Sequence, residues 1–279
     1  MTTLRPMHPL LAALIDHFRA ASEGGQRPVA VAFSGGVDST LALWAARQAL
    51  GELAMGVSVR SEFICGAERA RAEAMAAHLG LSLGADRRCG VVVRRVSALA
   101  DASLRANGPD RCYLCKRQVL AAVDKAACDR FARPAVIADG TNADDDPARP
   151  GRRALAEAGA VSPLAACGIP KQGVRELARA IGLPNAGDPS NSCLATRVPT
   201  GHELTHKRLT AVEALERAAR DLGLADLRAR LVPGEAGRPD SVRLEVRPAQ
   251  LLLARSLERA LAERAAFIGL AQLTIGERS

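Results

Sequence analysis

Aromatic side chains are scarce in this sequence, with five Phe, one Tyr and one Trp among 279 residues. Proteins that hold single-stranded nucleic acid stack its bases on aromatic rings, so this scarcity argues against a surface of that kind. A substantial core is still expected, because 48% of the residues are hydrophobic and the length suffices for one large and one small domain. That core must rest mainly on Ala, Leu and Val.

The sequence also lacks a long apolar run. No stretch reaches the roughly 18 apolar residues of a membrane-spanning helix, so no membrane partner is expected. Met1–Ala21 has apolar residues at helical spacing, interrupted by Asp16 and His17, which is typical of an amphipathic helix rather than an export signal. Seven cysteines without such a signal are expected to be reduced thiols in a cytoplasmic protein.

Positive charge exceeds negative charge, with 38 Lys and Arg against 30 Asp and Glu, a formal net charge of +8. A basic balance suits either nucleic acid or a small polyanion. The arginines are scattered rather than clustered, so we expect a small nucleotide-like substrate and no nucleic-acid partner.

Strand and helix patterns alternate along the first two thirds of the chain. Strands are expected at Val29–Phe33, Ala54–Val59, Val91–Val96 and Ala135–Ala138, and helices at Leu41–Leu50, Glu68–Leu79, Cys112–Cys128 and Lys171–Ile181. This alternation predicts an α/β fold with a doubly wound parallel sheet, whose ligands lie outside the carboxyl ends of the strands.

The last third has a different pattern, which predicts a second, smaller α+β domain. Helices are expected at Leu204–Leu222 and Ala249–Glu263, and strands at Leu227–Val232, Val242–Val246 and Leu270–Ile275. Pro199-Thr200-Gly201 suits a connection, so we expect one domain over residues 1–200 and another over residues 201–279.

The stretch Val29–Thr40 reads VAVAFSGGVDST, a buried strand followed by a glycine loop and a helix. Such a unit binds anions, because glycine lets the backbone approach closely and the first helical turn leaves N–H groups without internal partners. Ser34, Ser39 and Thr40 add hydroxyl donors, and Asp38 is suited to hold the Mg²⁺ that accompanies a nucleotide.

The SGGVDS sequence at residues 34–39 resembles the pyrophosphate loop of the PP-loop ATPases, whose fold is that of the adenine nucleotide alpha hydrolases. It differs from the Walker loop, whose lysine is missing. The resemblance implies an ATP site. Its expected residues are Phe33, Ser34, Gly35, Gly36, Val37, Asp38, Ser39 and Thr40, with Ser58 and Gly140 from two other strand ends.

Three cysteines stand in notable contexts. Cys112 and Cys115 form a CxxC at the start of an expected helix, and Cys193 follows far along the chain. A CxxC fits zinc, thiol exchange or an iron–sulfur cluster. Zinc would need a fourth ligand, for which His202 and His206 are the near candidates, whereas three thiolates suit a [4Fe–4S] cluster with one open iron. Alternatively, Cys112 and Cys115 pack as small apolar residues and Cys193 is unrelated.

Two further segments make the resemblance more specific. SCLATRVPTG at residues 192–201 and DGTNADD at residues 139–145, followed by RPG and SPL, are similar to the LarE family over nearly the whole chain. These ATP-dependent sulfur transferases thiolate the precursor of the nickel-pincer cofactor of lactate racemase. The resemblance implies that a substrate carboxylate is adenylylated and then receives sulfur.

Family members are of two kinds. Those with only the cysteine matching Cys193 sacrifice its sulfur, whereas those with an additional CxxC are expected to hold a [4Fe–4S] cluster that delivers sulfide. Cys112 and Cys115 place this chain with the second kind.

Charged residues complete the expected site. Lys116 and Arg197 offer positive charge for the reaction, and Cys193, Asp38 and Lys116 form the expected catalytic set. Arg228 and Arg230 alternate on a strand, share one face and suit a substrate phosphate. The resemblance implies a substrate-binding set of Arg197, Glu216, Arg228, Arg230 and Glu245. For each of these side chains the alternative is a solvated surface position.

Other functions remain open at this stage. A tRNA-thiolating PP-loop enzyme also uses ATP and cysteines, an amidotransferase-type ligase would need an ammonia source, and a non-catalytic nucleotide-binding regulator would need no reaction. LarE relatives are often oligomers, so a homo-oligomer is among the expectations. Relatives usually finish with an LDLxGxRSGSMN-like segment, and the sequence ends at Leu273–Ser279 before its last part. No contact is assigned to that segment.

Overall fold

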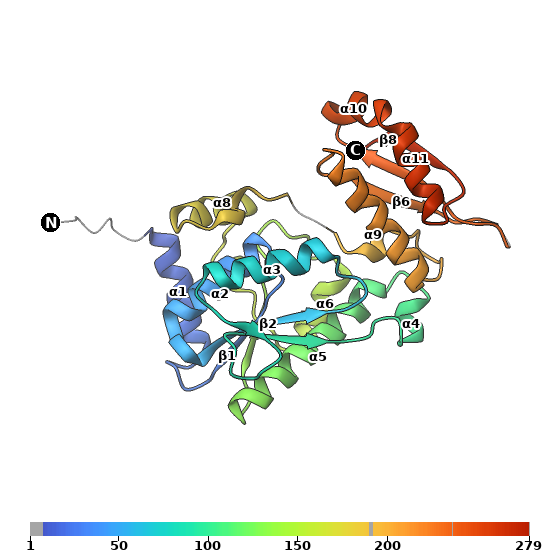
Figure 1. Ribbon diagram of the computed structural model, residues 1–279. Coiled ribbons are helices and arrows are strands. Elements are labelled where there is room, and N and C mark those ends of the chain that lie inside the picture. Colours follow the sequence, from blue (N-terminus) through green and yellow to red (C-terminus); the bar gives the residue numbers. More distant parts are fainter. Residues whose placement is uncertain (1–7, 190–191, 236, 279) are drawn as a thin grey trace. The chain divides into compact units, whose positions relative to one another are not determined.

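The computed structural model describes residues 8–189, 192–235 and 237–278 (Figure 1). The start of the helix expected at Met1–Ala21 and the last residue of the segment Leu273–Ser279 lie outside the described residues. Two compact units are present. The larger comprises Met1–Ser61, Gly66–Val96 and Cys112–Ser190, and the smaller Glu62–Cys65, Ser97–Arg111 and Asn191–Ser279. The domain boundary expected at residue 200 stays a prediction.

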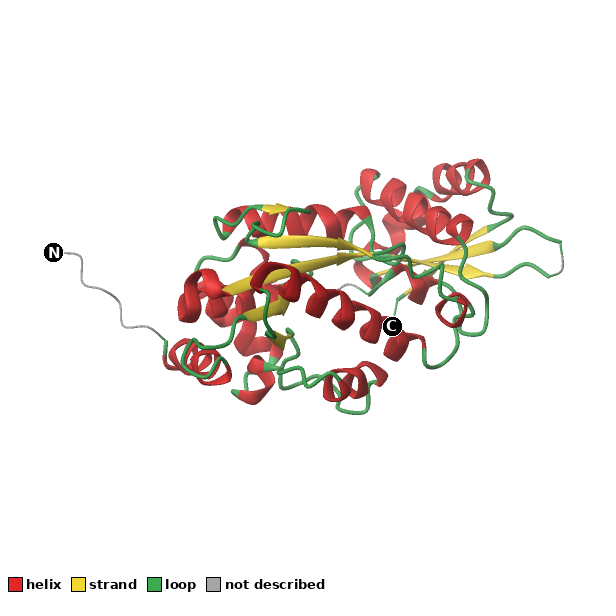
Figure 2. Cartoon of the chain, turned by 90° about the horizontal axis from the view of Figure 1, so that it is seen from below, coloured by secondary structure: helices red, strands yellow, loops and turns green. Residues whose placement is uncertain are grey.

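The larger unit is built on an all-parallel five-stranded sheet with the order β3-β4-β2-β1-β5. Figure 2 draws the strands in yellow and the helices in red. Its strands are β1 (Val29–Ala32), β2 (Ala54–Arg60), β3 (Leu83–Gly84), β4 (Val91–Arg95) and β5 (Val136–Ala138). This confirms the predicted doubly wound α/β class. β3 was not expected, because two residues are too few to show a strand period.

Helices cover both faces of this sheet. They are α1 (Pro9–Ala21), α2 (Val37–Leu50), α3 (Gly66–His78), α5 (Arg111–Phe131), α6 (Pro150–Glu157), α7 (Pro163–Ala166) and α8 (Lys171–Ala180), with the short 3₁₀ turns η1 (Gly51–Leu53) and η2 (Pro184–Gly187). Val29 and Val31 join the core beneath α1, α2 and α8. Ala30 points to the opposite face, where it packs with residues of α5 and α6. Alternate strand residues therefore supply two cores, as a sheet buried on both sides requires.

The strand order places a ligand crevice at β1. From β1 the chain builds β2, β3 and β4 on one side and then crosses to form β5 on the other side, where Val31 lies opposite Ala138. The carboxyl ends of β1 and β5 therefore mark the point where the winding reverses, the usual ligand position in such sheets.

The smaller unit contains a mixed three-stranded sheet of β6 (Arg228–Val232), β7 (Ser241–Val246) and β8 (Leu273–Glu277). β6 and β7 are antiparallel, whereas β7 and β8 are parallel. Its helical elements are α4 (Ala102–Arg105), η3 (Leu194–Arg197), α9 (His206–Asp221), η4 (Pro248–Gln250), α10 (Leu251–Ser256) and α11 (Glu258–Phe267). The single helix expected at Ala249–Glu263 is wrong, because the helix is interrupted at Leu257 between α10 and α11.

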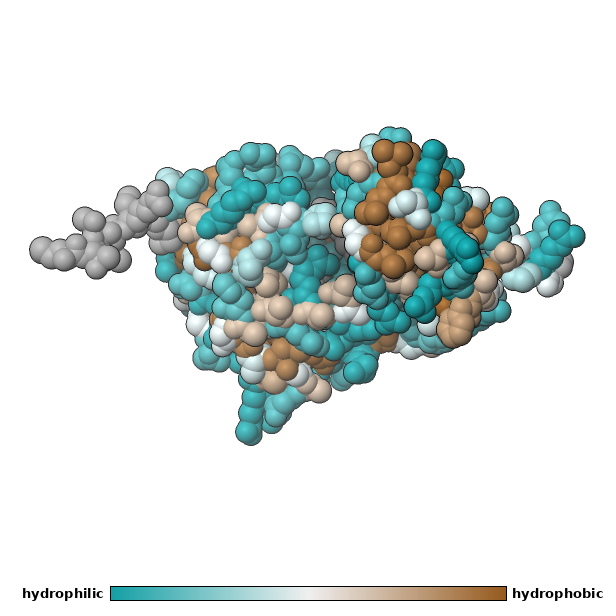
Figure 3. Space-filling view, turned by 45° about the horizontal axis from the view of Figure 1, so that its top comes forward, coloured by the Kyte–Doolittle hydropathy of each residue, from teal (hydrophilic) through white to brown (hydrophobic). Residues whose placement is uncertain are grey.

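The surface of the smaller unit carries exposed apolar side chains, which Figure 3 shows as a hydrophobic patch. Leu252 of α10 is 83% exposed and Phe267 of α11 is 85% exposed. Among the described residues, none of the helices has the length and apolar character needed to cross a membrane.

Candidate functional site

The glycine loop after β1 curls onto the start of α2. Ser39 Oγ donates to the carbonyl of Gly36 at 3.1 Å, and Ser34 Oγ accepts from Gly36 N at 3.3 Å. Gly36 caps α2 without a side-chain hydrogen bond in the described chain. The first N–H groups of this helix therefore lack a side-chain cap, which is the arrangement that binds anions.

Two glycines permit the close packing of this loop. Gly35 has a φ of +77°, and a Cβ there would lie 2.5 Å from the Cα of Ala72 in α3. A Cβ on Gly140 would lie 2.8 Å from the backbone nitrogen of Ser39. The loop after β5 thus packs directly against the first turn of α2, and a larger residue at either position would push the backbones apart.

The residues expected to bind ATP differ in how exposed they are to solvent. Phe33 is 3% exposed, Val37 4% and Ser58 5%. Phe33 N donates to the carbonyl of Val57 at 2.9 Å, at the end of the β1–β2 pairing. Ser34 and Gly36 are more exposed and lie at the same edge of the sheet. Their role in binding ATP stays a prediction.

Asp38 lies at the centre of a polar cluster beside the loop. The Nζ atom of Lys171, the first residue of α8, is 2.5 Å from Asp38 Oδ2. The side-chain amide of Asn142, in the loop after β5, donates to Asp38 Oδ1 at 3.3 Å. The carboxylate is 22% exposed, so both oxygens are engaged while one side remains open to solvent.

Lys116 of α5 pairs with a second carboxylate in this unit. Its Nζ atom is 3.1 Å from Oδ2 of Asp139, which also accepts from Thr141 Oγ1 at 2.7 Å. Ser162 Oγ donates to the other oxygen of Asp139 at 2.9 Å. Burial alone would raise the pKa of Asp139, but attraction by Lys116 and the hydrogen bonds from Thr141 outweigh it and lower the pKa. Asp139 is thereby held as a carboxylate that fixes the β5 loop.

The three expected metal-binding cysteines are divided between the units. Cys112 is exposed and Cys115 half-buried in the first turns of α5, where a spacing of three residues places them on one side of the helix. Cys193 is half-buried in the smaller unit and precedes η3. Among the described residues, no group of three or more His, Cys, Asp and Glu side chains stands ready for a metal ion. Cys193 belongs to one unit and the CxxC pair to the other, so the trio of thiolates stays a prediction.

Arg197 is not a solvated surface cation. Its side chain is 0% exposed, and its Nε lies 2.6 Å from Oε1 of Glu216, which is 2% exposed. Nη1 donates to the carbonyl of Ser192 at 2.9 Å and to its hydroxyl at 2.6 Å. The surface alternative considered for Arg197 and Glu216 is therefore wrong. Both residues lie inside the smaller unit and organise the turn that contains Cys193.

Arg228 and Arg230 project from the same face of β6, as the strand period predicts, and both are half-buried. Arg230 Nε lies 3.1 Å from Oε2 of Glu245, and Nη1 donates to the carbonyl of Thr196 at 2.7 Å. The pKa of Arg228 is lowered by burial and by repulsion from Arg278, Arg197 and Arg230, against attraction from Asp226, which itself pairs with Arg278. A positively charged group surrounded in this way attracts an anion.

Several polar residues near these sites were not expected from the sequence. In the larger unit they are Lys171, Asn142 and Asn185. The Asn185 side chain is 2% exposed and its Nδ2 donates to the carbonyl of Gly35 at 2.9 Å.

In the smaller unit, Arg278 joins the arginines around Arg228. Asn142 stands within the quoted DGTN motif and Lys171 begins an expected helix, but nothing in the sequence joins them to Asp38.

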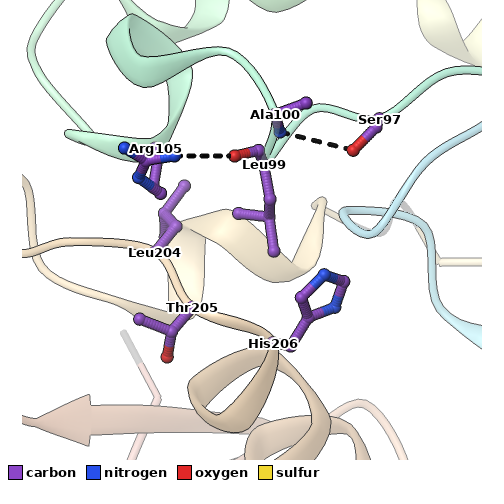
Figure 4. Close-up of a pocket in the computed structure, with 7 residues that line it drawn as sticks. All are labelled: Ser97, Leu99, Ala100, Arg105, Leu204, Thr205 and His206. Carbon is purple, nitrogen blue, oxygen red and sulfur yellow. Dashed lines mark hydrogen bonds between the residues drawn. The ribbon is translucent and has the colours of Figure 1, made fainter.

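A pocket of about 400 Å³ lies in the smaller unit, and His206, the alternative zinc ligand, is the one residue of its lining that the sequence singled out (Figure 4). It is lined by Ser97, Leu99, Ala100, Arg105, Leu204, Thr205 and His206. Its principal cation, Arg105, already donates to the carbonyl of Leu99 at 3.2 Å and pairs with Glu203 at 3.1 Å. Besides Arg105, the pocket therefore presents aliphatic side chains, two hydroxyl residues and a histidine.

No model of a protein family matches the chain. The chain is 32% identical over 222 residues to an uncharacterised protein of Synechocystis sp., covering 79% of this chain and 77% of that protein. It is 33% identical over 204 residues to the pyridinium-3,5-bisthiocarboxylic acid mononucleotide synthase of Lactiplantibacillus plantarum, covering 72% and 70% of the two chains. An uncharacterised protein of Methanocaldococcus jannaschii is 34% identical over 125 residues, which are 44% of this chain and 48% of that protein.

Proposed function

Because the chain belongs to the LarE family, we propose that it is a sulfur transferase that activates a carboxylate of a pyridinium mononucleotide with ATP and replaces its oxygen with sulfur. The name of the Lactiplantibacillus relative, which specifies a bisthiocarboxylic acid, supports this substrate class, since a thiocarboxylic acid is made from a carboxylic acid once an oxygen becomes a leaving group. The reaction belongs to the synthesis of a nickel-pincer cofactor.

One observation carries the proposal. The Ser34–Thr40 loop lies where the winding of the sheet reverses, and its helix begins without a side-chain cap in the described chain. Backbone N–H groups and the Ser34 and Ser39 hydroxyls suit the pyrophosphate end of ATP. The substrate carboxylate attacks the α-phosphorus, pyrophosphate leaves, and an acyl-adenylate forms. The contribution of the protein is to position the reactants and to offset charge.

Magnesium fits the residues of this site. Asp38 provides carboxylate oxygens at the loop and remains 22% exposed, and oxygen ligands of this kind are those that Mg²⁺ prefers. When bound, the ion would offset phosphate charge as pyrophosphate departs. Lys116 is engaged by Asp139 at 3.1 Å, so its role in catalysis is proposed to be positional, through the β5 loop.

The mononucleotide phosphate is assigned to the arginines of β6. Arg228 is half-buried, and Arg278, Arg197 and Arg230 around it are paired with carboxylates, so its own charge is the one that a phosphate dianion would offset. Glu245 holds Arg230 from one side, at 3.1 Å, and Arg197 with Glu216 fixes the neighbouring turn. These contacts are expected to orient the substrate rather than to react with it.

Cys112, Cys115 and Cys193 are proposed to hold a [4Fe–4S] cluster, which supplies sulfide to the activated carboxyl carbon when bound. Cys112 and Cys115 fit this role because their exposed or half-buried thiols share one side of α5. AMP leaves as sulfur adds. The alternative is that Cys193 gives up its own sulfur and becomes dehydroalanine.

The decisive experiment measures pyrophosphate release from ATP with pyridinium-3,5-dicarboxylic acid mononucleotide as the substrate. The wild-type chain should release pyrophosphate only with substrate and Mg²⁺. Asp38→Ala should abolish release while the fold persists, whereas Asp124→Ala, which removes an exposed carboxylate of α5, should leave it unchanged. Failure of the wild-type chain to form pyrophosphate would refute an adenylylating function.

Mass spectrometry of the protein after turnover separates the two sulfur sources, since only sacrifice of Cys193 removes hydrogen sulfide from the chain.

A further inference from the structure

Lys171 closes a ring of polar contacts beside the Ser34–Thr40 loop. Its Nζ atom lies 2.5 Å from Asp38 Oδ2, and its backbone N–H donates to Asp144 Oδ2 at 2.8 Å. Asp144 N in turn donates to Asn142 Oδ1 at 3.0 Å, and Asn142 Nδ2 donates to Asp38 Oδ1 at 3.3 Å. The backbone of Lys171 is therefore fixed to the β5 loop, and its side chain reaches the carboxylate at the start of α2.

This ion pair is arranged so that it can open. Lys171 is 28% exposed and Asp38 is 22% exposed, so solvent reaches both charged groups. Ion pairs that remain in contact with solvent are weaker than fully buried ones, and a lysine has a flexible stem with three rotatable donors. A divalent cation bound to Oδ2 of Asp38 would displace the ammonium group, because both compete for that oxygen.

The displaced ammonium group would lie beside the phosphate-binding loop. The hydrogen bond to Asp144 fixes the backbone of Lys171, and its Nζ atom reaches Asp38, two residues beyond the Gly36 cap of α2. An incoming nucleotide brings several phosphate charges to that edge. When Lys171 leaves the Asp38 carboxylate, phosphate oxygens therefore become the new acceptors for its ammonium group.

We propose that Lys171 is a phosphate-binding residue that is held on Asp38 before ATP arrives and transfers to an oxygen of the pyrophosphate moiety when Mg²⁺ occupies Asp38. This inference rests on the proposed ATP site. The same side chain also offsets the Asp38 carboxylate before the metal is present, so the site does not repel the incoming polyanion. No covalent bond changes in this exchange.

The first test compares the binding of ATP and AMP to the full chain by calorimetry in the presence of Mg²⁺. Lys171→Met should weaken ATP binding by roughly tenfold or more, as loss of a charge-assisted phosphate contact predicts. Binding of AMP, which lacks the pyrophosphate moiety, should change less than about twofold. Lys171→Arg should retain most of the ATP affinity, and Lys125→Met, which removes a 76% exposed lysine of α5, should bind as the wild type does.

The second test separates phosphate binding from simple neutralisation of Asp38. ATP binding is measured without Mg²⁺ for Asp38→Asn and for the double variant Asp38→Asn with Lys171→Met. If Lys171 binds phosphate, the double variant binds ATP roughly tenfold more weakly than Asp38→Asn. Equal affinities would overturn the inference, because an uncharged Asn needs no neutralising lysine.

The outcomes distinguish this inference from the proposed function. A wild-type chain that binds no ATP would refute the proposed function, and the inference with it. A wild-type chain that binds ATP with an affinity unchanged by Lys171→Met refutes the inference alone. Thermal unfolding of each variant shows whether the fold is retained, and the conservative Lys171→Arg keeps the test valid if Lys171→Met does not fold.

Discussion

Arg197 and Glu216 form a salt bridge inside the smaller unit, with Nε 2.6 Å from Oε1 and side-chain exposures of 0% and 2%. Glu216 also accepts from Arg220 Nη2 at 2.9 Å and from the backbone N–H of Ala229 at 3.1 Å. Its carboxylate therefore connects the turn after Cys193 to α9 and to β6. The pair positions the neighbouring cysteine and arginines, and its burial makes it sensitive to the loss of either partner.

Replacement of Glu216 by Ala should destabilise the protein strongly. It leaves the Arg197 guanidinium buried without its counter-charge, which typically costs about 3–5 kcal/mol. The measurement is the free energy of unfolding in urea. The control is Glu263→Ala, which breaks a surface ion pair between Arg259, 94% exposed, and Glu263, 67% exposed. This control variant should lose less than about 1 kcal/mol of unfolding free energy. Similar losses for the two variants would show that the buried pair has no special role.

The lowered pKa of Asp139 predicts a pH-dependent contribution to stability. Since the folded-state pKa lies below the ordinary value of 3.8, ionised Asp139 stabilises the fold above that value, and this contribution is lost as pH falls from 3.8 towards the folded-state pKa. Asp139→Asn should therefore lower the free energy of unfolding by about 1–3 kcal/mol near neutral pH. The difference from wild type should shrink in acid, and a difference independent of pH would contradict the assignment.

Arg228→Ala should impair use of the mononucleotide substrate. Removing one guanidinium of the β6 phosphate site is expected to raise KM roughly tenfold or more, with a smaller effect on kcat. The dephosphorylated nucleoside should be used equally well by the variant and by wild type. Arg217→Ala, on an exposed part of α9, is the matched control. An equal loss of activity with both substrates would show that Arg228 supports the fold and does not bind the phosphate.

The three cysteines predict a chromophore. Protein prepared without oxygen and reconstituted with iron and sulfide should be brown and contain about four irons per chain, as a [4Fe–4S] cluster requires. Cys112→Ala, Cys115→Ala and Cys193→Ala should each lose the iron, whereas Cys128→Ala, at an exposed position of α5, should retain it. A colourless Cys112→Ala protein with full sulfur transfer would exclude the cluster as the sulfur source.

Much of the larger unit follows from local sequence patterns. Val-rich runs predict β1, β2 and β4, because strands buried on both faces are almost continuously apolar. The helical pattern predicts a start at Leu41, whereas α2 begins four residues earlier at Val37, because residues of the phosphate loop also form the first helical turn. The break between α10 and α11 has no glycine or proline at Leu257 to mark it.

The candidate site likewise has one part that the sequence predicts and another part that it does not. The glycine loop is local in sequence and could be identified directly, whereas its partners depend on which elements fold side by side. Lys171 is 133 positions from Asp38, and Asn185 is 150 positions from Gly35. The burial of Glu216 had a weak signal, since the position shares a helix face with Leu209, Val212 and Ala219 of α9.

The smaller unit combines segments that are far apart in the sequence, and this affects how the chain can fold during synthesis. Phe63 accepts a hydrogen bond from Leu194 N at 2.9 Å, and the Asn107 amide donates to the carbonyl of Pro199 at 2.8 Å. Both early stretches emerge during synthesis long before their partners and must wait for them. A fragment beginning at residue 201 would lack these early stretches, so this unit cannot be excised by a single cut.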